Sequence, residues 1–422
     1  MKNQTTSRFK RKPSRSSASP AGGSNSGRPS HSGSRSGGPS RGNSKKLKKG
    51  AEIPHHKFIQ AALPREEEPK IETRPYTALD LHPDLLHNIT AKGYTHTTPI
   101  QDQAIEPGMA GRDILGIAQT GTGKTAAFLI PMIQMWLQDP DFPSALVTVP
   151  TRELALQVEE EFRSLTNRLG MYSATFIGGA NINTDLRKLE KGHHLIVGTP
   201  GRLLDLTQRR ALNLRPFTTL VLDEFDRMLD LGFINDVKKI IELMPNRHQT
   251  MLFSATIDKS QQPYIQELLT DPVTVQVHTG TTTAEHIEQD VIRIEPGMDK
   301  YDVLEGLLQQ PEMEKVLVFL ETKHRVDRLT TKLVRSGFKA QQIHGNKSQS
   351  QRQRALEAFK AGRANILVAT DVAARGLDIS DVTHVINFET PKTFDSYIHR
   401  IGRTGRAGKA GKAFTFVEGV VN

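Results

Sequence analysis

Short apolar runs rich in β-branched residues recur along this chain, and each run ends in small or polar residues. They begin at Ser144 (SALVTVP), His194 (HLIVGTP), Thr218 (TTLVLDE) and Thr250 (TMLFSAT). Between them lie stretches with helical spacing, such as 153–169 and 233–243, which are too long for hairpin turns. Buried runs that alternate with helices predict a parallel sheet covered by helices on both faces.

The same pattern occurs twice, so the chain is predicted to contain two α/β domains. It pauses at the polar segment 278–286 (HTGTTTAEH) and resumes with runs that begin at Lys315, Ala364, Thr383 and Lys412. A chain of 422 residues also exceeds what one hydrophobic core usually organises. We expect four parts: a tail and linker at 1–74, a first domain at 75–278, an interdomain linker at 279–285 and a second domain at 286–422.

The excess of basic charge lies at the N-terminus. Residues 1–50 hold 13 Lys and Arg and no Asp or Glu, whereas the remaining residues carry 43 basic and 46 acidic side chains. With 13 Ser, 8 Gly and almost nothing apolar, this segment is predicted to be disordered. A basic Ser/Gly/Arg tail suits loose binding to a polyanion such as RNA, and the alternative is a solubilising leader without a specific partner.

Composition excludes several classes of protein. The chain has no cysteine, which removes disulfides, thiolate metal sites and cysteine nucleophiles. The longest apolar runs, such as 126–133, are shorter than the roughly 18–20 residues of a membrane span, and the N-terminus has no apolar stretch typical of a signal peptide. We therefore expect a cytoplasmic protein with no membrane partner. We also expect it to be a monomer.

Residues 118–125 (AQTGTGKT) fit the end of a phosphate-binding loop between a strand and an apolar helix. Gly121 and Gly123 permit a tight turn whose backbone N–H groups face the phosphates. Lys124 would reach the β and γ oxygens, and Thr125 would offer its hydroxyl to Mg²⁺.

A group of carboxylates supplies what this loop lacks. The run TLVLDEFD (219–226) ends in three acids, and Asp223 at the strand terminus is placed to hold Mg²⁺. Glu224 beside it could orient and deprotonate an attacking water. Such acids alone often form a solvated turn, but together with the loop they predict a site for phosphoryl transfer.

Seven motifs then make the chain resemble a DEAD-box ATP-dependent RNA helicase of superfamily two, most similar to the bacterial RhlE-like branch. They are AQTGTGKT, PTRELA (150–155), TPGR (199–202), DEFD (223–226, in place of DEAD), SAT (254–256), ATDVAARGLDI (369–379) and HRIGRTGR (399–406). The resemblance covers nearly everything from Tyr76 to Val417. It implies two RecA-like domains in tandem, the cofactors ATP and Mg²⁺, and RNA as a partner bound largely independently of sequence.

The resemblance also assigns the nucleotide site residue by residue. Gln101 would read adenine, for which an amide that both donates and accepts is suited. Tyr76 would stack on the base, Thr120 and Thr122 would complete the phosphate loop, and Asp378 would contact the ribose. Arg403 and Arg406 would reach the γ-phosphate as arginine fingers and act with Lys124, Asp223 and Glu224 in catalysis.

Further positions match the family's RNA path and the motif that couples the two sites. The RNA path comprises Pro150, Thr151, Arg152, Gly179, Thr199, Pro200, Gly201, Arg202, Gln349, Arg352 and Thr370. Glycines, helix N-termini and hydroxyls can hold phosphates and 2′-hydroxyls without reading bases. The coupling residues are Asp226, Ser254, Thr256 and His399.

Three positions depart from the family's pattern. Phe225 replaces the alanine of the acidic motif, Tyr76 replaces the usual Phe, and Thr97 replaces a usual Pro. A bulky ring between two functional acids has to find a packing space, and the sequence does not show where.

The resemblance implies an RNA-dependent ATPase that unwinds short RNA duplexes or remodels ribonucleoprotein, with RNA-processing proteins as further partners. Two alternatives stay open. One is an ATP-gated RNA clamp or assembly factor without net unwinding. The other is a DNA-directed helicase of the same superfamily, against which the glutamine motif argues.

Overall fold

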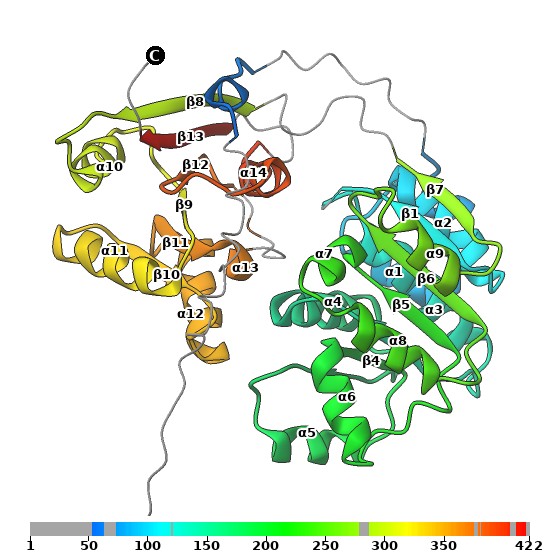
Figure 1. Ribbon diagram of the computed structural model, residues 1–422. Helices are drawn as coiled ribbons and strands as arrows, with labels where there is room; N and C mark the ends of the chain where they lie inside the picture. Colours follow the sequence, from blue (N-terminus) through cyan, green and yellow to red (C-terminus); the bar gives the residue numbers. More distant parts are fainter. Residues whose placement is uncertain are drawn as a thin grey trace, which may run out of the picture. The chain divides into compact units, whose positions relative to one another are not determined.

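The computed structural model describes residues 53–62, 73–119, 121–277, 287–374, 379, 381–405 and 411–418. It contains two parallel sheets in tandem, each with helices on both faces (Figure 1), which confirms the predicted fold class. The basic segment 1–50 and the interdomain linker 279–285 lie outside the described residues. Within the part that the structure describes, no helix is both long enough and apolar enough to cross a membrane.

The first domain is built on seven parallel strands in the order β3-β4-β2-β5-β6-β1-β7. The strands are β1 (Ile114–Ile117), β2 (Ala145–Thr148), β3 (Ser173–Phe176), β4 (Leu195–Gly198), β5 (Thr219–Leu222), β6 (Gln249–Ser254) and β7 (Val273–Gln276). The helices are η2 (Tyr76–Ala78), α1 (Pro83–Ala91), α2 (Pro99–Met109), α3 (Lys124–Gln138), α4 (Arg152–Leu165), α5 (Ile182–Leu189), α6 (Pro200–Gln208), α7 (Phe225–Asp230), α8 (Ile234–Glu242) and α9 (Gln262–Leu268).

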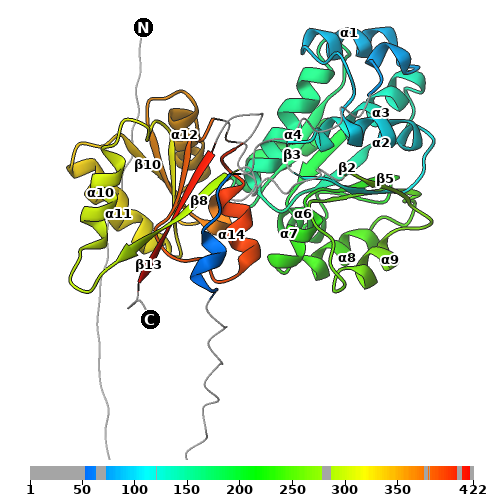
Figure 2. The same cartoon turned by 90° about the horizontal axis from the view of Figure 1, so that it is seen from above.

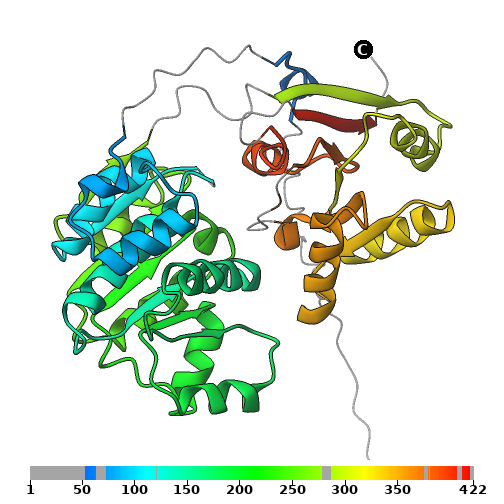
Figure 3. The same cartoon turned by 180° about the vertical axis from the view of Figure 1, so that it is seen from behind.

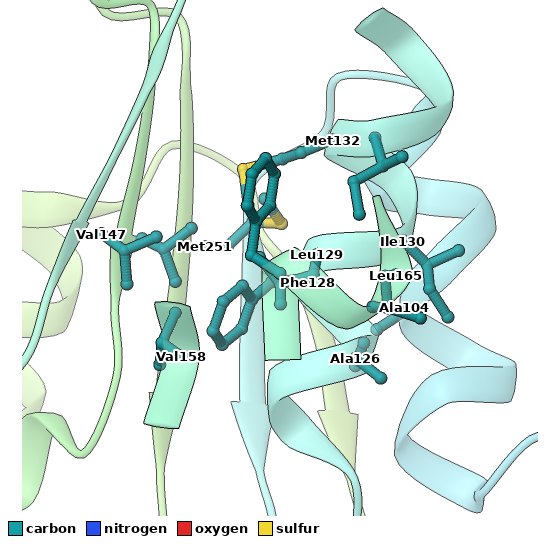
Figure 4. Packing of buried hydrophobic residues seen from close by; sticks show 14 of the residues in the cluster. Ala104, Ala126, Phe128, Leu129, Ile130, Met132, Val147, Val158, Leu165 and Met251 are labelled. Atoms are coloured by element: carbon teal, nitrogen blue, oxygen red, sulfur yellow. The ribbon is translucent and has the colours of Figure 1, made fainter. Parts of the chain in front are cut away.

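Alternate residues of the central strands enter two separate cores, one on each face of this sheet. In β2, Val147 packs with α1 to α4, whereas its neighbour Leu146 packs with α6 to α9. Helix α3 is almost entirely buried, and Figure 4 shows Phe128, Leu129 and Met132 of this helix beside the sheet residues. Burial on both faces explains why the central strands are continuous apolar runs.

The second domain is built on six parallel strands in the order β10-β11-β9-β12-β13-β8. The strands are β8 (Ile287–Ile294), β9 (Val316–Leu320), β10 (Ala340–Ile343), β11 (Ile366–Thr370), β12 (His384–Asn387) and β13 (Gly411–Glu418). The helices are α10 (Lys300–Leu308), α11 (Lys323–Arg335), α12 (Gln349–Lys360), α13 (Asp371–Ala374) and α14 (Phe394–Ile401). Figure 2 shows α10 and α11 on one face of this sheet and α14 on the other.

The nine central strands confirm the predicted apolar runs, but four strands were not predicted. These are β3 and β7 in the first sheet and β8 and β10 in the second, and all four lie at sheet edges. Three of them, β7, β8 and β10, mix buried with exposed residues, so they lack the apolar runs of the central strands.

The assignment of residues 1–74 as tail and linker is incomplete. A single-turn 3₁₀ helix, η1 (His55–Phe58), lies in this range, and Gln60 pairs with Gln289 of β8 in an antiparallel bridge. Phe58 is fully buried in the core of the second domain. One aromatic side chain in a polar stretch gives no periodic signal, which is why the sequence did not reveal this contact.

Candidate active site

The predicted motifs of the first domain lie at one edge of its sheet, because all of them follow the carboxyl ends of parallel strands. The phosphate loop, the acidic motif and SAT follow β1, β5 and β6, which are neighbours in the sheet. The RNA-path motifs follow β2, β3 and β4, which form the other half. The motifs that the resemblance assigns to the nucleotide thus lie on one half of this edge, here called the nucleotide half, and those that it assigns to the RNA path lie on the other, here called the RNA half.

The phosphate loop has the tight turn that its glycines predict. Gly121 and Gly123 have φ values of +87° and +94°, a left-handed conformation that side chains with a Cβ rarely adopt. Lys124 begins α3 and is buried, and its Nζ donates to the carbonyl oxygen of Ala118 at 2.7 Å. This contact holds the ammonium inside the loop, where a nucleotide's phosphates would replace the carbonyl.

Gln101 connects the phosphate loop to the start of α2. It is the third residue of the helix and forms a capping box with Thr98, whose backbone N–H donates to Gln101 Oε1 at 2.8 Å. Its Nε2 donates to the carbonyl oxygen of Gly123 at 3.1 Å. A Cβ at Gly123 would meet Gln101 Nε2 at 2.4 Å, so this close contact requires glycine.

Tyr76 does not present its ring to a base in this structure. Its ring is only 2% exposed, and its hydroxyl donates to Gln101 Oε1. The prediction that Tyr76 stacks on adenine therefore finds no exposed ring face, and the residue instead supports Gln101. The ring of Tyr94 stacks on that of Tyr76 with a centroid distance of 6.4 Å. Tyr94 and Lys92 line a cavity beside the phosphate loop, and the sequence analysis had not singled out either residue.

Thr97 uses its hydroxyl where the family usually has Pro. Thr97 Oγ1 lies within hydrogen-bond distance of two acceptors, the carbonyl oxygen of Arg74 at 3.0 Å and Asp102 Oδ1 at 3.1 Å, which share its single proton. Arg74 in turn pairs with Asp102 through its Nε at 2.9 Å. The replacement thus joins the start of α2 to the segment that precedes it.

Asp223 lies at the end of β5 and is 2% exposed. Burial raises the pKa of its carboxyl group to about 6, although the charge of Lys124 opposes this shift. Its Oδ1 accepts a hydrogen bond from the backbone N–H of Glu224 at 2.9 Å. A buried carboxylate that is costly to ionise is suited to a site where a divalent cation supplies the missing positive charge.

Glu224 adopts a left-handed backbone conformation, with φ of +53° and ψ of +52°, at the N-terminus of α7. Its Oε2 accepts a hydrogen bond from Arg227 Nη1 at 2.7 Å. Burial acts to raise the pKa of Glu224, but the charges of Arg227, Lys124 and Arg403 outweigh it and lower the pKa. The carboxylate is therefore held in its ionised form at the end of the strand.

Asp226 binds the SAT motif directly. Its Oδ2 accepts hydrogen bonds at 3.2 Å from the backbone N–H groups of Ala255 and Thr256 and from the hydroxyl of Thr256. Ser254 donates its hydroxyl to the carbonyl oxygen of Thr256 at 2.7 Å. Three of the predicted coupling residues, Asp226, Ser254 and Thr256, are thus in contact.

Phe225 finds its packing space in the second core of the first domain, on the face that α6 to α9 cover. Its ring is fully buried and points away from the two acids that flank it in sequence, Glu224 and Asp226. The departure from alanine therefore changes the core rather than the polar site.

A cavity of about 560 Å³ lies between the phosphate loop and the first two acids of the acidic motif. Its lining includes Gly121, Lys124, Thr125, Asp223, Glu224 and, from the second domain, Arg403. The volume lies in the range of small-molecule sites. Three predicted site residues, Thr120, Asp378 and Arg406, lie outside the described residues.

The donor set fits Mg²⁺. The hydroxyl of Thr125 and the carboxylate of Asp223 face one cavity, and hard oxygen ligands are those that this ion prefers. Within the described residues, no group of three or more His, Asp or Glu side chains could hold a metal without help. Phosphate oxygens of a nucleotide would therefore complete the coordination.

In the RNA half, the PTRELA segment packs on a glycine turn. Thr151 caps α4, and its Oγ1 accepts a hydrogen bond from the backbone N–H of Leu154. A Cβ at Gly179 would meet Arg152 Nη1 at 2.6 Å, so the guanidinium lies directly over this turn. The arrangement presents backbone groups and a cation at the ends of β2 and β3.

In the TPGR segment, Thr199 precedes α6, which begins at Pro200 and Gly201, and its Oγ1 accepts a hydrogen bond from the backbone N–H of Gly178 at 3.4 Å. Arg202 forms a largely buried ion pair with Asp185 at 2.8 Å and donates to the carbonyl oxygen of Ala180. Arg202 is therefore engaged in holding the loop after β3, which had not been predicted.

In the second domain, Gln349 and Arg352 lie in the first turn of α12, after β10. Both contact Glu153 of the PTRELA segment: Arg352 Nη2 lies 2.9 Å from Glu153 Oε2, and Gln349 Nε2 donates to Oε1 at 3.3 Å. Thr370 ends β11, and His399 lies in α14. Glu153 is thus a further residue of this site that the sequence analysis had not singled out.

Two family models match the chain, one in each of the two domains. A model described as DEAD/DEAH box helicase matches residues 98–264, and one described as helicase conserved C-terminal domain matches residues 299–408. A DEAD-box ATP-dependent RNA helicase CshA of Bacillus licheniformis is 46% identical over 347 residues, which are 82% of this chain and 71% of that protein. The chain belongs to the DEAD-box helicase family.

Other relatives extend this comparison. The CshA protein of Bacillus subtilis is 44% identical to this DEAD-box chain, with 82% of the chain and 70% of the relative covered. The CshA protein of Streptococcus pneumoniae is also 44% identical, with 81% of the chain covered. The matched region spans 65% of the length of the pneumococcal protein.

Solved structures of DEAD-box proteins share the fold. S. cerevisiae Dbp5 bound to RNA and ADP BeF3 aligns with a TM-score of 0.71 and 31% identity, over 82% of this chain and 90% of that one. The DEAD-box helicase Mss116 bound to ssRNA and UDP-BeF aligns with a TM-score of 0.72 and 28% identity. The alignment covers 85% of this chain and 77% of the Mss116 chain. Both domains of this DEAD-box chain are RecA-like.

Proposed function

We propose that this protein is an RNA-dependent ATPase that uses ATP and Mg²⁺ to unwind short RNA duplexes locally or to remodel ribonucleoprotein. RNA would bind largely independently of sequence, along the ends of β2 to β4 and the first turn of α12. The relatives are named as ATP-dependent RNA helicases, and two similar structures contain RNA. We also propose a cytoplasmic monomer and, from its motifs, a place near the RhlE-like branch.

One observation carries the proposal. Asp226 joins the acidic motif, which lies in the nucleotide half of the sheet edge, to Thr256 of SAT by two hydrogen bonds of 3.2 Å. Through these bonds, hydrolysis at Glu224 would be sensed at SAT, the motif that the resemblance assigns to coupling. A simple nucleotide-binding domain would not need this connection.

The chemistry follows from the residues that face the cavity. Lys124 and Mg²⁺ held by Thr125 and Asp223 would neutralise the phosphate oxygens, and Glu224 would orient the attacking water and accept its proton. Arg403 and Arg406 would stabilise the charge that develops on the γ-phosphate. Because these arginines belong to the second domain, full catalysis would require the two domains to act together.

The test is the ATPase rate without nucleic acid, with RNA and with DNA, together with strand displacement of a short RNA duplex. We expect stimulation by RNA alone and displacement that requires ATP. Glu224→Gln is the matched control, because it keeps the size of the side chain and the Mg²⁺ ligand Asp223 while removing the base. It should bind ATP and RNA but hydrolyse ATP very slowly, and near wild-type hydrolysis would contradict the assignment of Glu224.

The same assay separates the alternatives. Stimulation by RNA without any strand displacement would favour an ATP-gated clamp or assembly factor. Equal stimulation by DNA would favour a DNA-directed helicase. No stimulation by either nucleic acid would refute the proposed function.

A further inference from the structure

Residues 53–62, here called the strap, precede the first domain in sequence but pack on the second. Phe58 is fully buried and belongs to the core cluster of the second domain that also contains Ile287 of β8 and Tyr397 of α14. Its ring lies edge-on to that of Tyr397, with a centroid distance of 4.8 Å and an interplanar angle of 63°. Lys57 Nζ lies 5.6 Å from the centroid of the Phe394 ring. In Figures 1 and 3 the strap is the blue segment beside β8.

Backbone hydrogen bonds fix the register of the strap. The N–H of Gln60 donates to the carbonyl oxygen of Gln289 at 2.9 Å, and the N–H of Gln289 donates to the carbonyl oxygen of Gln60 at 2.8 Å. Gln289 belongs to β8, the edge strand whose other neighbour is β13. The strap therefore covers part of a sheet edge that would otherwise present unpaired backbone groups.

Side chains connect the same three elements. The hydroxyl of Tyr397 in α14 donates to Gln289 Oε1 at 2.8 Å. Gln289 Nε2 donates to Gln60 Oε1 at 3.4 Å. Both Tyr397 and Gln289 are buried, so the strap, the edge strand and α14 share one apolar contact and one polar network. A segment that merely passed over the surface would have neither.

We propose that the strap is a cis-acting anchor: it docks on β8 and α14 of the second domain, attaches the basic segment 1–50 to that domain and forms a second connection between the domains. The first connection is residues 278–286, and the second is residues 63–72, between the strap and the start of the first domain. Two domains joined by one connection can rotate about it, whereas a second connection at a different point restricts that rotation.

The position of the anchor also bears on RNA binding, and this part rests on the proposed function. The 13 Lys and Arg of residues 1–50 directly precede the strap in sequence, and the strap packs on the second domain. If they bind phosphates, they add basic charge to the second domain rather than to the phosphate loop. Docking of the strap can be tested without RNA, so its failure and the failure of the proposed function are distinguishable.

A disulfide test suits this chain because it contains no cysteine. Gln60 and Gln289 exchange both backbone hydrogen bonds, a pairing with Cα atoms about 5.5 Å apart, which is within the range of a disulfide. The double variant Gln60→Cys/Gln289→Cys should form an intramolecular disulfide with oxidised glutathione. The control Ile59→Cys/Gln289→Cys should not, because neighbouring side chains of an extended segment point in opposite directions.

Each outcome is informative. A disulfide within one chain that is lost on adding Phe58→Ala, but kept with Ile59→Ala, would support the anchor, because Phe58 is buried and Ile59 is half exposed. A disulfide between two chains would show that the strap docks on a second copy and would overturn the cis arrangement. Equal reaction of test and control pairs, or no reaction, would overturn docking itself.

The restriction of domain rotation is measured separately by single-molecule fluorescence transfer. Dyes at Tyr172→Cys in the first domain and Val334→Cys in the second would use exposed positions outside the proposed site. In the absence of nucleotide, Phe58→Ala should broaden the distribution of transfer efficiencies, and Ile59→Ala should leave it unchanged. Equal widths for all three proteins would refute the second connection.

Discussion

Asp223→Asn should stabilise the nucleotide-free protein and abolish ATP hydrolysis. Burial raises the pKa of this carboxyl group from 3.8 to about 6, which means that its ionised form is disfavoured in the folded state. Above pH 6 the group is ionised in both the folded and the unfolded chain. Burying its charge then lowers the stability of the folded wild-type protein by the full amount. Asparagine has nearly the same shape, keeps an oxygen to accept the N–H of Glu224 and carries no charge.

The magnitude follows from the shift. A difference of about two pKa units corresponds to about 3 kcal/mol, gained by the variant at pH 8. As the pH falls, Asp223 becomes protonated in the folded wild-type protein and the cost of its buried charge disappears. About half of the stability difference between the variant and the wild type therefore remains at pH 5, and little remains at pH 4. For a domain of this size, 3 kcal/mol corresponds to a rise in Tm of roughly 6–12 °C.

The assay is chemical and thermal unfolding between pH 5 and pH 8, with EDTA and without nucleotide. Asp226→Asn is the matched control, since it makes the same change in the same motif. The Asp226 carboxylate accepts hydrogen bonds from Ala255 and Thr256, so this variant should be less stable than the wild type. If Asp223→Asn did not raise the free energy of unfolding, or if the rise did not become smaller as the pH falls, the cost assigned to the buried charge would be refuted.

Three further variants test the site and its supports. Phe225→Ala should lower the free energy of unfolding by about 3–5 kcal/mol, because it empties a fully buried ring position. The control Met298→Ala, at an exposed position, should change it by less than about 0.5 kcal/mol, and equal denaturation midpoints for the two variants would contradict this prediction. Arg227→Gln should raise the pKa of Glu224 and move the acidic limb of the ATPase pH profile to higher pH, whereas Arg227→Lys should stay closer to the wild type. An unmoved limb would show that the 2.7 Å ion pair between Arg227 and Glu224 does not control the pKa of Glu224. Gln101→Ala should weaken ATP binding and its preference over pyrimidine triphosphates by about 1–3 kcal/mol, so unchanged discrimination in binding titrations would leave Gln101 with a structural role only.

Local sequence was sufficient for the central strands and for the phosphate and acidic motifs. Strands such as β2 and β5 are buried on both faces and therefore appear as continuous apolar runs. The motifs that follow them lie at the carboxyl ends of parallel strands, so their meeting at one edge follows from the fold class alone. The same reasoning predicted that Asp223 and Lys124 would share a site, and both line the cavity.

Tertiary structure decided what depends on distant partners. Edge strands such as β8 and β10 are half exposed and have no continuous apolar run, so the sheet around them determines their conformation. The ring of Tyr76 is buried and Arg202 pairs with Asp185, because neighbours far away in sequence offer better contacts than solvent does. The strap shows the same dependence: Phe58 has no amphipathic pattern around it, and only the folded second domain supplies the apolar site that it occupies.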